Sequence, residues 1–123
     1  MGWCIRGIRG ATTVDANTEA AIDAAVAELL TTLCERNPFA PEDICSVIFS
    51  TTPDLNAMFP SQAARKHLSR WENVALLDLN QMQTATGITH CVRVLVQVNT
   101  PVAPDQIHHV YLRGARQLRP DRI

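Results

Sequence analysis

The sequence lacks the features that mark membrane, exported and metal-binding proteins. No apolar run in its 123 residues approaches the roughly 20 that span a bilayer, and Arg6 precedes any apolar signal-peptide core. Its formal net charge of -1 gives no strong positive field, so we expect neither a nucleic-acid nor a membrane partner. The 4 cysteines include no Cys-x-x-Cys pair and lie in apolar segments. We therefore expect no metal site, and reduced core thiols in a cytoplasmic protein.

Groups for acid–base, nucleophilic or phosphate chemistry are equally scarce. The 5 glycines form no phosphate-binding loop, and no serine or cysteine has the spacing of a nucleophile beside a base. We interpret the adjacent His108 and His109 as mainly structural, and we expect His67 and His90 to be isolated and exposed. A reaction that needs no proton transfer by the protein fits these residues best.

Apolar periodicity predicts a single domain, residues 1–123, in the order strand, helix, strand, helix and three further strands. Thr18 can cap a long amphipathic helix that ends at Asn37, and a short helix is predicted from Pro60 to Leu68. The strands are predicted over residues 3–11, 44–52, 74–79, 91–98 and 107–112. This order indicates an α+β fold with a mixed sheet. The long helix can cover one face, whereas the short helix would leave part of the other face bare, which favours oligomerisation.

What the sequence does have is arginine inside apolar strands. Arg6 and Arg9 are three residues apart, so they point to opposite faces of one strand. Arg93 lies in the middle of another strand, opposite a face of alternating valines. A guanidinium in such surroundings is rarely buried without an anionic partner. Each arginine alone is more often structural, but together with Tyr111 and Arg119 they could clamp a small polyanion such as a carboxylate ligand.

Several motifs in the same order resemble the AroH-type, Bacillus-like chorismate mutases, a family of small trimeric enzymes. They are Arg6–Val14 (RGIRGATTV), Thr52–Ala57 (TPDLNA) with Phe59-Pro60, Cys91–Val94 (CVRV), Ile107–Leu112 (IHHVYL) and Leu118–Asp121 (LRPD). The resemblance implies a mixed five-stranded sheet with two helices in each subunit. It also implies a homotrimer that forms a pseudo-α/β-barrel, with active sites at the subunit interfaces. The implied reaction is the isomerisation of chorismate to prephenate for phenylalanine and tyrosine biosynthesis, without a cofactor.

The resemblance also assigns roles to individual residues. Arg93 would donate to the ether oxygen of chorismate, where negative charge develops in the transition state. Arg9 and Tyr111 would hold a substrate carboxylate. Further substrate contacts are implied for Phe59, as a wall from the neighbouring subunit, for Arg65 at the mouth of the site, and for Leu118 and Arg119 in a closing tail.

Three positions depart from the family pattern. Gln62 stands where lysine is usual, Gln81 where an active-site glutamate is usual, and Asp78 where cysteine is frequent. We hypothesise that Asp78 supplies the carboxylate that is lacking at Gln81, which requires a bulge near Leu79-Asn80 to bring both to one face. The alternative is a catalytically weak relative that binds chorismate or prephenate as a sensor or partner subunit. Other trimeric enzymes, such as imine deaminases, share the composition of the site but not these motifs.

Overall fold

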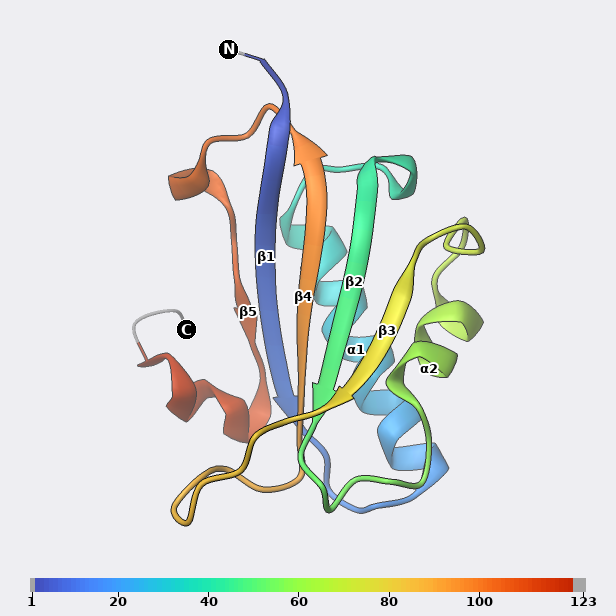
Figure 1. The fold of residues 1–123 in the computed structure, drawn as a ribbon, viewed down its shortest axis with the longest axis vertical. Coiled ribbons are helices and arrows are strands. Elements are labelled where there is room, and N and C mark those ends of the chain that lie inside the picture. Colours follow the sequence, from blue (N-terminus) through green and yellow to red (C-terminus); the bar gives the residue numbers. More distant parts are fainter. Residues whose placement is uncertain (1, 121–123) are drawn as a thin grey trace.

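Five strands form one mixed sheet in the computed structural model, which describes residues 2–120 (Figure 1). The strands are β1 (Cys4–Thr13), β2 (Ile44–Thr51), β3 (Leu76–Asn80), β4 (Cys91–Thr100) and β5 (Val110–Tyr111). Their order in the sheet is β3-β2-β4-β1-β5. β4 is antiparallel to β1 and β2, whereas β3 and β5 pair parallel with β2 and β1. The predicted mixed sheet is confirmed, although the strand predicted over residues 107–112 is reduced to 2 residues.

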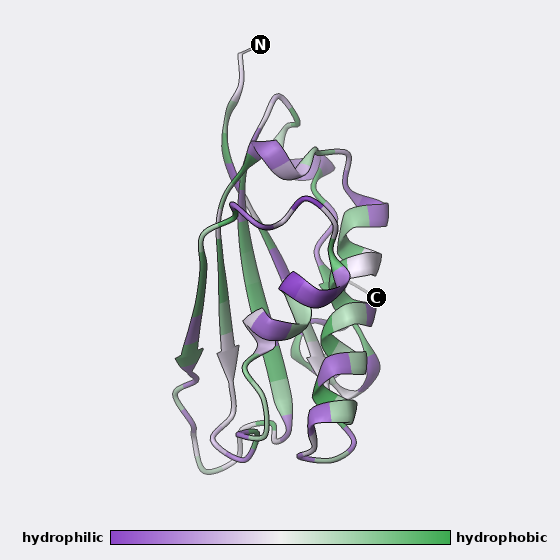
Figure 2. Ribbon diagram, turned by 90° about the vertical axis from the view of Figure 1, so that its right-hand side faces the viewer, coloured by the Kyte–Doolittle hydropathy of each residue, from purple (hydrophilic) through white to green (hydrophobic). Residues whose placement is uncertain are grey.

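Both α-helices lie on the same face of this sheet. α1 (Glu19–Arg36) connects β1 to β2, α2 (Pro60–His67) connects β2 to β3, and the two helices contact each other (Figure 2). Each connection joins parallel strands and steps across the sheet in the same direction, so right-handed crossovers place both helices on one side. The expectation that the short helix would cover the opposite face is therefore wrong, and neither α1 nor α2 lies on that face.

The main core lies between the sheet and the two helices. Thr18 Oγ1 accepts from the Ala21 N–H at 3.1 Å and caps α1, as predicted. The buried stripe of α1 consists of Ile22, Ala25, Val26, Leu29, Leu30 and Leu33. β4 contributes the buried Val92, Val94, Val96 and Val98. Gly10 permits close packing, because a Cβ there would lie 3.1 Å from Val94 Cγ1 and 3.2 Å from Leu29 Cδ1.

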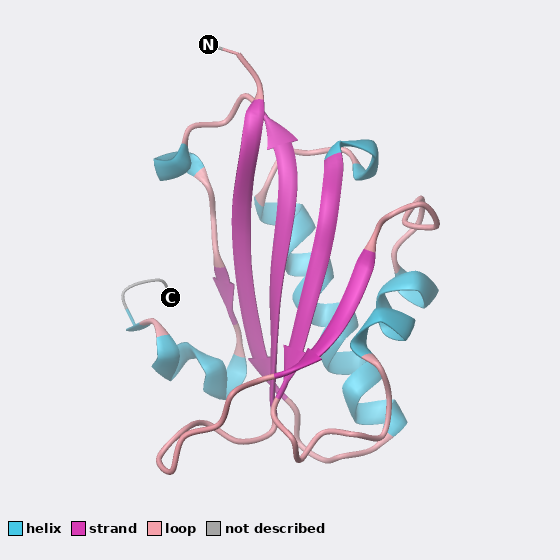
Figure 3. Cartoon of the chain, viewed as in Figure 1, coloured by secondary structure: helices cyan, strands magenta, loops and turns pink. Residues whose placement is uncertain are grey.

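The opposite face of the sheet, called the open face below, is covered near one end by irregular structure. The 3₁₀ turn η3 (Arg113–Leu118), which follows β5, lies here (Figure 3). The other two 3₁₀ turns, η1 (Pro41–Asp43) and η2 (Pro104–Gln106), lead toward β2 and β5, and their flanking residues Ile44 and Ile107 pack on the main core. Leu118 of η3 and Ile88 pack on a small cluster of Ala11, Cys91, Tyr111 and Ala115. Further along this face Ile5, Leu77 and Leu79 are about half exposed. Apolar side chains gathered on an open face are typical of a partner surface.

Some expectations about single side chains are wrong. Cys4 and Cys45 are exposed instead of lying in the core, whereas Cys91 is buried, and all the thiols are free. His67 is not isolated, because its Nε2 lies 2.7 Å from Asp23 Oδ2. Within residues 2–120, no helix combines the length and the apolar character that a membrane crossing requires. Among the same residues, no three histidine, cysteine, aspartate or glutamate side chains are grouped as metal ligands.

Candidate active site

Three of the predicted site residues lie together on the open face. In the strand register, Ala11 of β1 is paired with Arg93 of β4 and with Tyr111 of β5, and Arg9 comes two residues earlier on β1. Because alternate residues share a face, Arg9, Arg93 and Tyr111 point to the same side. They line a common hollow of about 220 Å³. Arg6 lies on the opposite face, as predicted, where its Nε donates to a backbone carbonyl at 3.2 Å.

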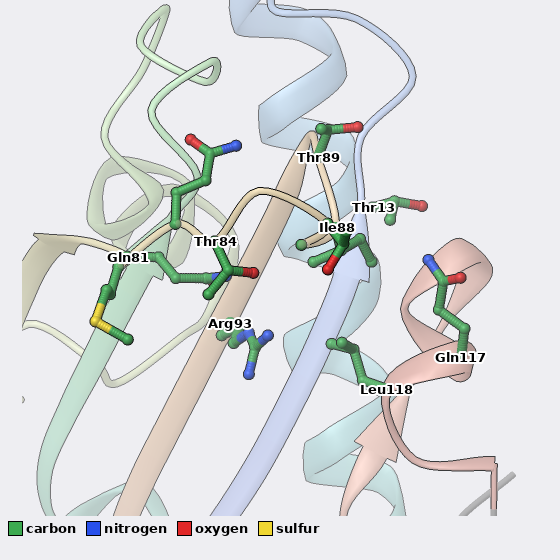
Figure 4. A pocket seen from close by; sticks show the side chains of 12 residues that line it. Thr13, Gln81, Thr84, Ile88, Thr89, Arg93, Gln117 and Leu118 are labelled. Carbon is green, nitrogen blue, oxygen red and sulfur yellow. The ribbon is translucent and has the colours of Figure 1, made fainter.

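A larger cleft adjoins this hollow, and Arg93 belongs to both (Figure 4). The walls of the cleft are residues 81–89, which follow β3, and the end of η3, and its volume is about 960 Å³. Figure 4 shows Gln81 and Leu118 on opposite sides of Arg93. Arg119, the next residue after Leu118, is half-buried. Residues far apart in the sequence therefore surround one cationic side chain.

No carboxylate of the described residues compensates the charge of the two arginines. Within the described residues, neither Arg9 nor Arg93 forms an ion pair with a carboxylate. Burial raises the pKa of the nearby Cys91 thiol, and the opposing influence of Arg93 does not reverse that shift, so the thiol is neutral at pH 7. A guanidinium presents a planar fork of N–H donors that suits a carboxylate. The chemistry of these side chains on the open face therefore suits an anion.

Gln81 adds an unused hydrogen-bond acceptor to the cleft. Its backbone N–H donates to the Thr51 carbonyl at 2.8 Å, which continues the pairing of β2 with β3. Its side-chain Oε1 is buried and has no hydrogen-bond partner within residues 2–120. Because buried polar atoms in proteins are almost always satisfied, this oxygen is suited to accept a hydrogen bond from a ligand.

Phe59 lies outside this cleft. The segment after β2 and the start of α2 form a separate hollow of about 430 Å³, with Phe59, Gln62 and Asp78 in its lining. Arg65 is exposed one turn further along α2. Phe59 is itself 65% exposed in the single chain. Within one chain the hollow beside Phe59 and the cleft around Arg93 are therefore separate, and neither Phe59 nor Arg65 lines the cleft.

The sequence matches the family model "Chorismate mutase type I" over residues 5–122. The chain belongs to this family. It is 45% identical to chorismate mutase AroH of Bacillus subtilis (strain 168) over 117 residues, which are 95% of this chain and 91% of that protein. Identity to chorismate mutase AroH of Thermus thermophilus is 41% over 118 residues, 95% of each protein. A solved chorismate mutase structure from Clostridium thermocellum matches with a TM-score of 0.86 and 41% identity, over 91% of this chain and 98% of that one.

In this member of the chorismate mutase family, the structure contradicts the bulge that was expected beside Asp78. β2 and β3 pair without interruption from Val47–Leu76 to Thr51–Asn80, and Asp78 is opposite Phe49 on the helix-covered face. There its Oδ1 accepts from the Ser61 N–H at 3.0 Å and its Oδ2 from the Ser61 hydroxyl at 2.6 Å. Asp78 therefore caps the N-terminal turn of α2, and it does not reach the Arg93 cleft of its own chain.

Two side chains that anchor one wall of the Arg93 cleft were not predicted from the sequence. Thr52 Oγ1 donates to Asp54 Oδ1 at 2.5 Å and accepts from the Cys91 N–H at 2.9 Å. Asp54 also accepts from the His90 N–H at 3.0 Å, so His90 is not isolated, and segment 81–90 is tied to the loop after β2. Burial alone would raise the pKa of Asp54, but hydrogen bonds from Thr52 and His90 lower it overall. The available signal was the Thr52-Pro53-Asp54 turn within the family motif.

Proposed function

We propose that this protein is a chorismate mutase that isomerises chorismate to prephenate in the synthesis of phenylalanine and tyrosine. The observation that carries the proposal is the pair Arg9 and Arg93 beside Tyr111, neither arginine being paired with a carboxylate of residues 2–120, in a chain of the type I family. The substrate is a dianion, and its rearrangement breaks a carbon–oxygen bond while a carbon–carbon bond forms in the same molecule. This reaction requires neither proton transfer by the protein nor a cofactor. The free thiols favour a reducing compartment, the cytoplasm.

Arg93 has the central role in the proposed mechanism. Negative charge grows on the ether oxygen in the transition state, and positive character grows on the ring. Arg93 lies where the two hollows meet, so it can donate to that oxygen while Arg9 and Tyr111 bind a carboxylate. Oε1 of Gln81 can accept from the substrate hydroxyl. Donors that are in place before the reaction stabilise the developing charge more than the ground state, and they also hold the substrate in its compact reactive conformer.

We further propose that a neighbouring subunit completes each site in a homotrimer. Support comes from the separation of the Phe59 hollow from the Arg93 cleft, and from the half-exposed apolar residues Leu77 and Leu79 on the open face. A cyclic trimer would seat Phe59 and Arg65 of one subunit against the Arg93 cleft of the next. Leu118 and Arg119, at the other wall, would close over bound substrate.

The activity is tested by following the loss of chorismate absorbance after purified protein is added without a cofactor. We expect turnover by the parent protein. Calorimetry on the same sample measures chorismate binding separately. Binding without turnover would favour the sensor alternative, and the absence of both would contradict the proposal.

The interface sites are tested by mixing two variants with damage in different linings. Arg93→Ala damages one lining, and the double variant Phe59→Ala/Arg65→Ala damages the other. In a random equimolar mixture about three quarters of the trimers contain both variants, and each of these has both linings intact at one of its three interfaces. About a quarter of the parental activity should therefore be recovered. No recovery after verified subunit exchange would show that each site is built within one chain.

A further inference from the structure

Phe59 is an exposed aromatic side chain in an irregular segment whose backbone is nevertheless held in place. Residues 52–59, between β2 and α2, contain no helix or strand. Asn17 Oδ1 accepts from the N–H groups of Asn56 at 2.9 Å and Ala57 at 3.0 Å. Asn17 Nδ2 also donates to the side-chain oxygen of Asn56 at 2.7 Å. One side chain from a distant turn therefore satisfies two backbone donors just before Phe59.

Asn17 is itself fixed by the elements around it. It lies in the turn between β1 and α1, three residues after the buried Val14 and next to the helix cap Thr18. On the other side of Phe59, Ser61 is held by Asp78 through its backbone N–H and its hydroxyl. The chain is thus held by hydrogen bonds at Ala57 and at Ser61, two residues before and two residues after Phe59.

We propose that Asn17 is a positioning residue that holds Phe59 as a preformed wall for bound substrate. This inference rests on the proposed function, in which Phe59 contacts the substrate bound by the neighbouring subunit. A residue that is 65% exposed has few contacts of its own, so its position must be set by the backbone on either side. Preorganisation matters here, because a wall that must be ordered when substrate binds weakens binding by the free energy that its ordering costs.

Two substitutions at Asn17 and one control separate positioning from general stability. Asn17→Asp keeps an oxygen that can accept from both backbone N–H groups, and a rotated Asn56 amide can donate to its second oxygen, whereas Asn17→Ala keeps no acceptor. We expect Asn17→Ala to raise KM for chorismate about tenfold while kcat falls less than about threefold, since an apolar wall contacts the ground and transition states alike. Asn17→Asp should return KM to within about threefold of the parent value. Asn73→Ala, at an exposed asparagine in another turn, should leave both constants at parental values.

Amide hydrogen exchange at Asn56 and Ala57 tests the clamp without relying on activity. We expect these two amides to exchange at least about tenfold faster in Asn17→Ala than in the parent protein. A parental KM in Asn17→Ala, or equal impairment in the alanine and aspartate variants, would overturn the positioning role. If the parent protein does not turn over chorismate, the proposed function fails. The exchange rates then decide separately whether Asn17 orders the Phe59 segment.

Discussion

Neighbouring residues of β4 differ in role because they belong to different faces of the sheet. On the covered face Val92, Val94 and Val96 are buried beneath the helices, whereas Arg93 is exposed in the cleft of the open face. The covered face contributes burial of apolar surface, which stabilises the fold in proportion to area. The open face contributes fixed charge, whose effect depends on geometry. Substitutions at adjacent positions should therefore separate stability from catalysis.

Phe49, on the covered face, gives the largest expected change. Its side chain is fully buried, and its strand neighbours are Val94 and Asp78. Phe49→Ala is expected to lower the free energy of unfolding by about 3–5 kcal/mol, because it removes buried contacts and leaves a cavity. Guanidinium unfolding at a fixed protein concentration measures this loss, with Arg93→Ala as the matched variant of the open face. Equal losses in the two variants would contradict the division between the faces.

Arg93 gives the corresponding change in catalysis. Arg93→Ala is expected to lower kcat about 10²–10³-fold, because loss of one preorganised donor costs about 3–4 kcal/mol in the transition state. Initial rates of chorismate loss measure the effect. Arg6→Ala is the control, since Arg6 lies on the opposite face and donates to a backbone carbonyl. Its kcat should stay within about threefold of the parent value. A similar fall in both variants would show that the arginines act through net charge or folding.

The fold could be predicted from the sequence where local patterns decide it. Alternation along β4 identified its two faces, and helical spacing with Thr18 identified α1. The placement of α2 could not be predicted in the same way, because it depends on strand order and on the handedness of two crossovers. The shortness of β5 also depends on its neighbours, since only Gly10 and Ala11 of β1 pair with it.

The grouping of residues in the candidate site was predictable in part for similar reasons. The strand pattern and the family motifs indicated Arg9, Arg93 and Tyr111, and the strand register then brought them to one hollow. The roles of Asn17 and Asp54 were not visible, because their hydrogen bonds reach segments distant in the sequence. Sequence position alone does not show which backbone donors a side chain will satisfy.

Gln81 is a position at which the charge of the open face can be changed while the shape of the side chain is kept. Gln81→Glu is expected to raise kcat about tenfold. The attraction between a carboxylate and the developing ring cation, at a separation of about 10 Å or less, would lower the free energy of the transition state by on the order of 1–2 kcal/mol. Gln81→Ala, which removes the acceptor, is expected to lower kcat. The two variants and the parent protein are compared at saturating chorismate. A lower kcat in Gln81→Glu would show that a neutral acceptor is required beside Arg93.

Asp78→Asn gives the smallest expected change, because this covered-face carboxylate caps a helix and does not face the cleft of its own chain. Asparagine can still accept from the Ser61 N–H, and its amide can donate to the Ser61 hydroxyl, so the cap of α2 survives. We expect kcat and KM within about threefold of the parent values. Asp78→Ala retains neither bond and should lower the free energy of unfolding by about 0.5–2 kcal/mol. A large loss of kcat in Asp78→Asn with parental thermal stability would instead assign this carboxylate to the chemistry, and the covered face would then contribute a catalytic group.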